Sequence, residues 1–357
     1  MSARAICRAF LFALLAGAAG GACAAADSGL EIYFIDVEGG QSTLVVTPDR
    51  HSILIDTGWA GDGTGFRPGD PHRARDANRI VAAARDAGVG RIDYLLITHF
   101  HTDHDGGVSE LAQLVPIGVF IDHGSPSEEA EKTSVETRDG FVAYAKVRSR
   151  AAGHIEPRPG DRLPLTDVEA TVVSSAAATL AEPLPGAGER TPGCRDRAIA
   201  PRDPYENPRS TGVVIRYGAF RFLDLGDLSG EPLFRLACPR SLVGPVDVYL
   251  VAHHGGPDVA DPAIFAGFRP RVAIMNNGVT KGGALSTYQT LHQVQGLDVW
   301  QLHLSAEAAD NNFAAARVAN LDESTAHWIK LVARRDGSFR VLNQRTGEWQ
   351  EYAARPR

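Results

Sequence analysis

Residues 98–104 read THFHTDH, and this stretch decides the fold and the chemistry that the chain suggests. It holds three histidines and one aspartate in seven positions. The preceding residues 91–98 (RIDYLLIT) form a short apolar run rich in branched side chains, which is typical of a buried strand. Imidazole nitrogen and carboxylate oxygen suit zinc, and also manganese or iron, at a water-accessible centre. The sequence therefore predicts a metal-binding loop directly after a strand.

The spacing within this loop predicts two neighbouring positions for cations. His99 and His101 can point the same way, while Asp103 and His104 turn towards a second position about 3.5–4 Å away. We expect Asp103 both to bind a cation and to orient the reacting water. The alternative is that these are ordinary polar loop residues, which three histidines in six positions make hard to accept.

The pattern His-x-His-x-Asp-His in this loop resembles the metal-binding signature of the metallo-β-lactamase superfamily. Three further stretches resemble motifs of that superfamily in the same order along the chain, namely residues 52–58 (SILIDTG), 222–227 (FLDLGD) and 248–256 (VYLVAHHGG). The resemblance implies an α+β fold, in which two mixed β-sheets and flanking helices form an αββα sandwich. It also implies a site at one edge of that sandwich.

The flanking motifs add candidate site residues. The resemblance implies that Asp56 supports the site and that Asp227 bridges two cations; the alternative for Asp227 is an aspartate that caps the following helix. Neighbouring side chains on a strand point to opposite sides, so one residue of the His253–His254 pair is expected to bind metal. We take His254 as the metal ligand and His253 as a proton donor or a hydrogen-bonding neighbour of a ligand, although the sequence leaves open which of the two binds metal.

Within the superfamily, the chain is most similar to the hydrolase domain of bacterial competence (DNA-uptake) proteins, here in a secreted stand-alone form. This similarity rests on residues 35–44 (IDVEGGQSTL) together with the later GD and HHG. Secreted phosphorylcholine esterases are similar as well. The IDVEGG stretch departs from the usual glycine-rich form.

One ligand of the superfamily is missing from this sequence. A third histidine usually stands about twenty residues before the bridging aspartate, and residues 206–210 (ENPRS) occupy that neighbourhood here. We expect His303, at the end of the strand-like run 299–303, to complete the site of His99 and His101. The alternative is a half-buried histidine near a strand end.

Lys281 lies in a glycine-rich turn after a predicted strand. Its positive charge is expected to steady the negative charge that develops on a substrate. A solvated lysine in a simple turn is the alternative.

Periodicity places regular elements around these motifs. We expect strands at residues 31–37, 42–47, 52–56, 117–122, 212–217, 220–225 and 246–252, and helices at residues 74–87, 108–114 and 231–237. One domain is expected over residues 27–357, since 44% of the 357 residues are hydrophobic and can form a large core. Residues 124–165 are predicted to be an insertion and residues 176–209 a long loop.

The first 26 residues have the layout of a secretory signal peptide. Arg4 and Arg8 precede an apolar run over residues 9–17, and small residues follow. Gly20 stands where a lipoprotein signal carries a large aliphatic residue, so we do not expect lipid attachment at Cys23. The protein is predicted to be exported, to the periplasm or beyond, without a membrane span.

The net charge limits the classes of substrate that we expect, and the cysteine content bears on a possible disulfide. The formal net charge is −7, and removal of Arg4 and Arg8 with the signal makes it −9. An acidic protein is poorly suited to follow a phosphate backbone, so we expect a small-molecule or phosphoester substrate rather than extended nucleic acid.

Cys194 and Cys238 remain after export, either as a disulfide or as two free thiols. The oligomeric state stays open.

The predicted activity is hydrolysis of an ester-type bond by metal-activated water, with one or two zinc ions and a phosphoester favoured over a lactone or β-lactam. A catalytically degenerate metal-binding protein is the alternative from another class. A flavin-partnered di-iron protein ranks last, because no flavodoxin-like segment is evident.

Overall fold

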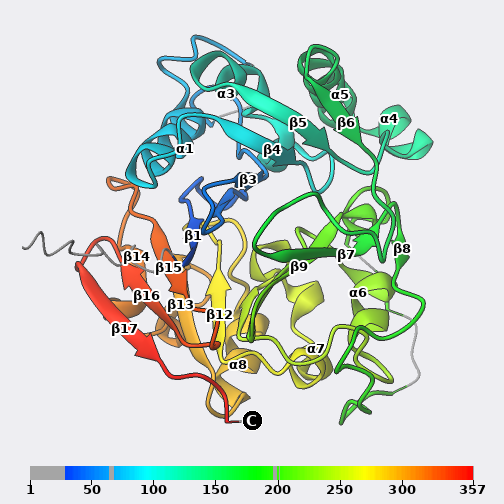
Figure 1. The fold of residues 1–357 in the computed structure, drawn as a ribbon, viewed down its shortest axis with the longest axis vertical. Helices are drawn as coiled ribbons and strands as arrows, with labels where there is room; N and C mark the ends of the chain where they lie inside the picture. Colours follow the sequence, from blue (N-terminus) through cyan, green and yellow to red (C-terminus); the bar gives the residue numbers. More distant parts are fainter. Residues whose placement is uncertain (1–28, 64–67, 196–198, 201, 357) are drawn as a thin grey trace, which may run out of the picture.

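The structure is a computed structural model that describes residues 29–63, 68–195, 199–200 and 202–356. The predicted signal peptide, with Cys23, lies outside the described residues. Two β-sheets pack face to face, and helices cover the outer face of each (Figure 1). The αββα sandwich expected from the sequence is thereby confirmed.

The first sheet contains nine strands and carries the amino-terminal half of the motifs. In spatial order these are β17 (Glu348–Tyr352), β16 (Phe339–Asn343), β15 (Ile329–Ala333), β1 (Leu30–Phe34), β2 (Thr43–Val46), β3 (Ser52–Ile55), β4 (Ile92–Leu96), β5 (Ile117–Ile121) and β6 (Gly153–Ile155). Strands β3 to β6 pair in parallel, while the other neighbours are antiparallel.

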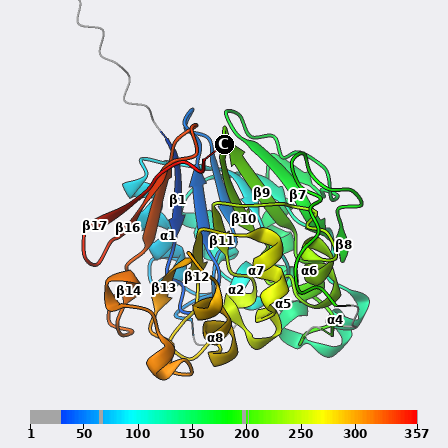
Figure 2. The same cartoon turned by 90° about the horizontal axis from the view of Figure 1, so that it is seen from below.

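The second sheet contains eight strands and carries the later motifs. Their order is β14 (Val318–Asn320), β13 (Asp298–His303), β12 (Val272–Met275), β11 (Val248–Leu250), β10 (Phe220–Asp224), β9 (Gly212–Tyr217), β7 (Glu169–Ser175) and β8 (Ala178–Thr179). Strands β10 to β14 pair in parallel. Figure 2 shows strands of both sheets running side by side through the sandwich.

The main core lies between the sheets, where alternate side chains of both meet. Phe34 of β1 and Phe222 of β10 illustrate this contact, with ring centroids 5.6 Å apart in an edge-on arrangement. Because both faces of each sheet are covered, strands such as β3 and β11 are buried at every position.

The helices fill the two outer layers. Helix α1 (Arg75–Asp86) buries Ala77, Ile80, Val81 and Ala84, a spacing that places one apolar stripe against the first sheet. The other α-helices within the described residues are α2 (Thr102–Asp105), α3 (Val108–Leu114), α4 (Glu128–Thr133), α5 (Val135–Arg148), α6 (Gly230–Ala237), α7 (Pro262–Phe268) and α8 (Leu285–Gln293). Apolar residues of α6, α7 and α8 pack on the outer face of the second sheet.

Most predicted elements agree with the structure to within two residues at each end. Residues 108–114 and 212–217 have the predicted bounds. Strand β11 is shorter than the expected 246–252, because the chain soon turns into the 3₁₀ helix η2 (His253–Gly255). The parallel strands β3 and β4 in one sheet, and β10 and β11 in the other, bring the loops that carry the motifs to one edge.

Two segments singled out in the sequence have distinct structures. Residues 124–165 hold α4, α5 and the edge strand β6. The described part of residues 176–209 holds β8 and the 3₁₀ helix η1 (Asn207–Arg209) and is otherwise irregular. Cys194 and Cys238 form a disulfide with Cα atoms 5.8 Å apart, which ties this loop to the end of α6. Among the described residues, no helix is long and apolar enough to cross a membrane.

Candidate metal centre

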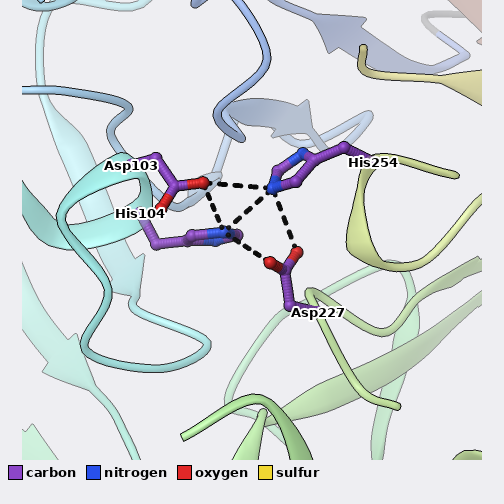
Figure 3. A group of neighbouring side chains, drawn as sticks. All are labelled: Asp103, His104, Asp227 and His254. Atoms are coloured by element: carbon purple, nitrogen blue, oxygen red, sulfur yellow. Dashed lines mark hydrogen bonds and ion pairs between the residues drawn. The ribbon is translucent and has the colours of Figure 1, made fainter. Parts of the chain in front are cut away.

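Four buried side chains from separate parts of the chain meet at the edge of the sandwich (Figure 3). Asp103 and His104 come from α2, Asp227 from the turn after β10, and His254 from η2. We call these residues the four-ligand group. One ligand atom from each lies within 4.8 Å of the others.

The distances in the four-ligand group match the requirements of a small cation. His104 Nε2 lies 3.3 Å from Asp103 Oδ2, 3.3 Å from Asp227 Oδ2 and 3.3 Å from His254 Nε2. His254 Nε2 lies 3.1 Å from Asp103 Oδ2 and 3.2 Å from Asp227 Oδ1. In a tetrahedral site with bonds of about 2.0–2.2 Å, neighbouring ligand atoms are roughly 3.3–3.6 Å apart. The residues present therefore fit a bound divalent metal ion.

Hydrogen bonds between these side chains explain the arrangement less well than a bound metal ion does. A neutral imidazole carries one N–H, yet His104 Nε2 faces three partners, and one of them is another ring nitrogen. Burial alone would raise the pKa of Asp227, but His254 and His104 hold it well below its ordinary value. The carboxylate is therefore charged, as a metal ligand must be.

A second group shares Asp227 with the first. His99 Nε2 lies 2.9 Å from His101 Nδ1 and 4.0 Å from Asp227 Oδ2. We call His99, His101 and Asp227 the three-ligand group. His99 is buried, whereas the His101 side chain is 28% exposed. A position with three protein ligands and an open side is the kind that metal enzymes use for water or substrate.

The glycine before Asp227 permits the close approach of the two sheets. Gly226 has φ of 55°, in the left-handed region, and a Cβ there would lie 2.7 Å from Thr98 Cβ. Thr98 N and Oγ1 donate to Asp56 at 2.7 and 2.8 Å, and Thr98 precedes the metal loop. Only glycine at position 226 lets the turn after β10 lie directly against this loop.

Asp56, expected from the sequence to support the site, lies behind a ligand. Its Oδ2 is 2.7 Å from His104 Nδ1, and both side chains are buried. A carboxylate on the far nitrogen fixes the ring and leaves Nε2 facing the four-ligand group.

The two adjacent histidines point into different surroundings. His253 and His254 have φ of 49° and 51°, so the chain turns sharply and only His254 joins the four-ligand group. His253 Nδ1 is 2.8 Å from Asp258 Oδ1, while its Nε2 lies 3.8 Å from Asp227 Oδ2. Burial opposes protonation of His253, but Asp227 and Asp258 raise its pKa above the ordinary value.

Lys281 contacts Asp103 of the four-ligand group. Its ammonium makes a very short contact with the Asp103 carboxylate, donates to Gly39 O at 3.1 Å and lies 4.9 Å from the centre of the Trp59 ring. Burial alone would raise the pKa of Asp103, but Lys281 and His104 hold it well below the ordinary value. Lys281 therefore pairs with Asp103 in this structure, and its role towards a substrate stays a prediction.

The placement of His303 differs from the sequence-based expectation and corrects it. His303 is buried, and its Nε2 lies 2.7 Å from Asp36 Oδ1 and 3.3 Å from Glu38 Oε2. Strand β13 is separated from β11 by β12, and its last residue packs against the loop that follows β1. His303 thus belongs to a third group, with Asp36 and Glu38, and does not complete the three-ligand group.

Three residues that contact His101 or His253 were not predicted from the sequence. Asp203 Oδ2 is 2.9 Å from His101 Nε2, Asp258 holds His253, and Asn207 Nδ2 is 3.2 Å from His253 Nε2. Asp258 stands only five positions after His253, so its proximity was a usable signal. Asp203 and Asn207 belong to the long loop and offer no pattern that marks them.

Comparisons with known proteins support the superfamily. Residues 35–187 match the family model for the metallo-beta-lactamase superfamily. No curated protein matches the chain.

Several solved structures are similar to the chain. A HARLDQ-motif mutant of a metallo-beta-lactamase from Cronobacter sakazakii is 15% identical, with 61% of this chain and 75% of that one covered and a TM-score of 0.36. A diphosphatase from the PhnP family is 12% identical, with 75% and 94% covered and a TM-score of 0.38. CmlA, a diiron beta-hydroxylase from Streptomyces venezuelae, is 15% identical, with 76% and 48% covered and a TM-score of 0.37, so this chain spans about half its length.

The two-sheet sandwich is the arrangement of the metallo-beta-lactamase fold, and residues 35–187, which contain the loop of His99, His101, Asp103 and His104, match the model of the metallo-beta-lactamase superfamily.

Proposed function

We propose that the protein is an exported, metal-dependent hydrolase of ester-type bonds, with a phosphoester as the favoured substrate. The observation that carries this proposal is the sharing of Asp227 between the four-ligand and three-ligand groups. Nitrogen and oxygen donors in this arrangement suit zinc, and manganese or iron would also be accepted. The disulfide between Cys194 and Cys238 supports export, because such bonds persist in oxidising compartments.

A bound divalent cation would lower the pKa of water from 15.7 towards about 7 and polarise the oxygen of the scissile group. The four-ligand group would hold one cation by four protein atoms, and the three-ligand group a second beside the open side. Divalent cations held by the two groups would favour an anionic group such as a phosphoester over a neutral lactone. The acidic net charge of the chain argues against extended nucleic acid.

His253 is the residue that we propose moves the proton. Asp258 contacts His253 Nδ1 and keeps the ring oriented. The His253 side chain is 20% exposed and lies beside the three-ligand group. His253 would donate its Nε2 proton to the leaving oxygen as the bond from phosphorus to that oxygen breaks, and it would then be reprotonated from solvent. The attacking water would form the new bond to phosphorus and pass its proton to solvent.

Hydrolysis of bis-p-nitrophenyl phosphate by the mature protein tests this proposal. We expect turnover that disappears after treatment with a chelator, returns with added Zn²⁺ or Mn²⁺, and is abolished by His101→Ala. His253→Gln should lower kcat about 10²–10⁴-fold with the metal content retained. His72→Gln, at an exposed position, is the matched control and should change neither quantity.

Two results would overturn the proposal. Turnover of nitrocefin or a lactone without phosphoesterase activity would reverse the order of substrates. A full complement of metal without hydrolysis of a broad ester panel would instead indicate a catalytically degenerate metal-binding protein.

A further inference from the structure

We infer that Asp203 is a positioning residue, which fixes the His101 ring so that Nδ1 is the atom presented to the cation of the three-ligand group. The inference rests on the proposed metal-dependent function. Asp203 Oδ2 lies 2.9 Å from His101 Nε2, and Nδ1 of the same ring lies 2.9 Å from His99 Nε2. The carboxylate and the neighbouring ligand therefore contact opposite nitrogens of one imidazole.

The chemistry of an imidazole explains why this matters. When a carboxylate accepts the Nε2–H, the lone pair is on Nδ1 and the ring becomes a better donor. The same arrangement occurs elsewhere in this site, since Asp56 lies 2.7 Å from the far nitrogen of His104. His101 needs such support more than His104 does, because its side chain is 28% exposed whereas that of His104 is fully buried.

The chain supplies Asp203 from the segment where the superfamily usually has its third histidine. This segment is fastened to the metal loop by Glu206, whose carboxylate is buried and accepts Phe100 N at 3.3 Å and Ser127 N at 2.8 Å. Thus the segment contributes no imidazole to the three-ligand group. It contributes instead a carboxylate that holds one of the two imidazoles already present.

Asp203 also has a local structural role that a test must separate. Its carboxylate accepts the backbone N–H groups of Tyr205 at 2.8 Å and Glu206 at 3.1 Å, which stabilises the turn before η1. Asparagine and serine perform this kind of capping as well as aspartate. Neither of them places a negative charge on His101.

The inference can be tested without any measurement of activity. The metal-free mature protein is titrated with Zn²⁺, calorimetry measures the affinity of each ion, and elemental analysis measures the number of ions bound. We expect the wild type to bind two ions. Asp203→Asn and Asp203→Ser should bind one of them about 10–100-fold more weakly and show a much smaller change for the other. Asp203→Glu, which keeps the charge, should restore part of the loss.

A spectroscopic measurement distinguishes positioning from a structural role. Long-range ¹H–¹⁵N spectra should show His101 protonated on Nε2 in the wild type and a mixture of tautomers in Asp203→Asn. Asp258→Asn is the matched control, since it removes the same kind of carboxylate from a histidine outside both ligand groups, and it should leave both zinc affinities unchanged.

Each contrary outcome has a distinct meaning. Two unchanged affinities in Asp203→Asn and Asp203→Ser would overturn the inference while the proposed function stands. Equal loss of both ions with a lowered Tm would show a structural role and overturn it too. A wild type that binds no Zn²⁺ would overturn both proposals, whereas two ions without hydrolysis would overturn the proposed function alone.

Discussion

Asp56 Oδ2 lies 2.7 Å from His104 Nδ1, although 48 positions separate these residues in the chain. The contact forms because β3 and β4 are parallel neighbours, so the residues after both strands lie at the same edge of the first sheet. Asp56 also accepts two hydrogen bonds from Thr98. One buried carboxylate thereby fixes both the start of the metal loop and the orientation of a ligand ring.

We expect Asp56→Asn to weaken binding of the cation in the four-ligand group by about 10–100-fold, because the charged acceptor on His104 is lost. Competition with a chromophoric chelator measures this affinity. Asp336→Asn, at an exposed turn, is the control. Wild-type affinity in Asp56→Asn would mean that Asp56 matters for folding alone.

Gly226→Ala should destabilise the protein by about 1–3 kcal/mol, since a non-glycine residue would adopt a left-handed conformation there. The new Cβ would also press on Thr98. Urea unfolding measures the loss of free energy. Gly90→Ala, where a Cβ meets nothing within 4 Å, provides the comparison and should be close to neutral. Equal stability of the two variants would contradict the close approach described for Gly226.

Reduction of the disulfide is expected to lower the free energy of unfolding by about 2–4 kcal/mol, because the bond closes a loop between residues 44 positions apart. Unfolding measured with and without reductant reveals this loss. The double variant Cys194→Ala/Cys238→Ala should show the same lower stability and no response to reductant. A wild type that is insensitive to reductant, with free thiols detected, would argue against a stabilising role for the bond.

The group around His303 predicts a pH-dependent contribution to stability. Burial opposes protonation of His303, but the hydrogen bond and charge of Asp36, with Glu38, raise its pKa despite the opposing charge of Arg79. A raised folded-state pKa stabilises the protein fully below the unfolded value of about 6.5 and ceases to do so as pH rises through the folded value.

We therefore expect His303→Gln to cost more free energy of unfolding at about pH 6 than at about pH 9. Urea unfolding at both pH values gives the two differences, with His72→Gln, at an exposed position, as the control. The same cost at both pH values would show that His303 contributes through packing and not through its charge.

The clustering of these side chains could be predicted from the sequence because they follow strand ends in short motifs. His99, His101, Asp103 and His104 occupy a single loop, and parallel strands carry Asp227 to the same edge. His303 also ends a strand, yet that strand lies too far along the sheet for the expected contact. Strand-end position alone could not supply the order of the strands.

Contacts made by the long loop could not be predicted in this way. The approach of Asp203 to His101 lies in the described part of residues 176–209, where the disulfide and the contacts of Glu206 also join residues far apart in the sequence. Such contacts join residues about a hundred positions apart without a repeated pattern. They become visible only when the fold is known.

The single carboxylate of Asp227 gives the proposed centre a property that neither ligand group has by itself. Oδ1 lies towards His254, and Oδ2 lies towards His104, His99 and His253. Because Oδ2 faces both groups, an ion in one group would reduce the negative charge that the carboxylate offers to an ion in the other group. The two binding events would then be thermodynamically linked, and each would alter the affinity of the other by the same factor. Loading of this protein with metal is therefore expected to be a cooperative process and not the sum of two independent equilibria.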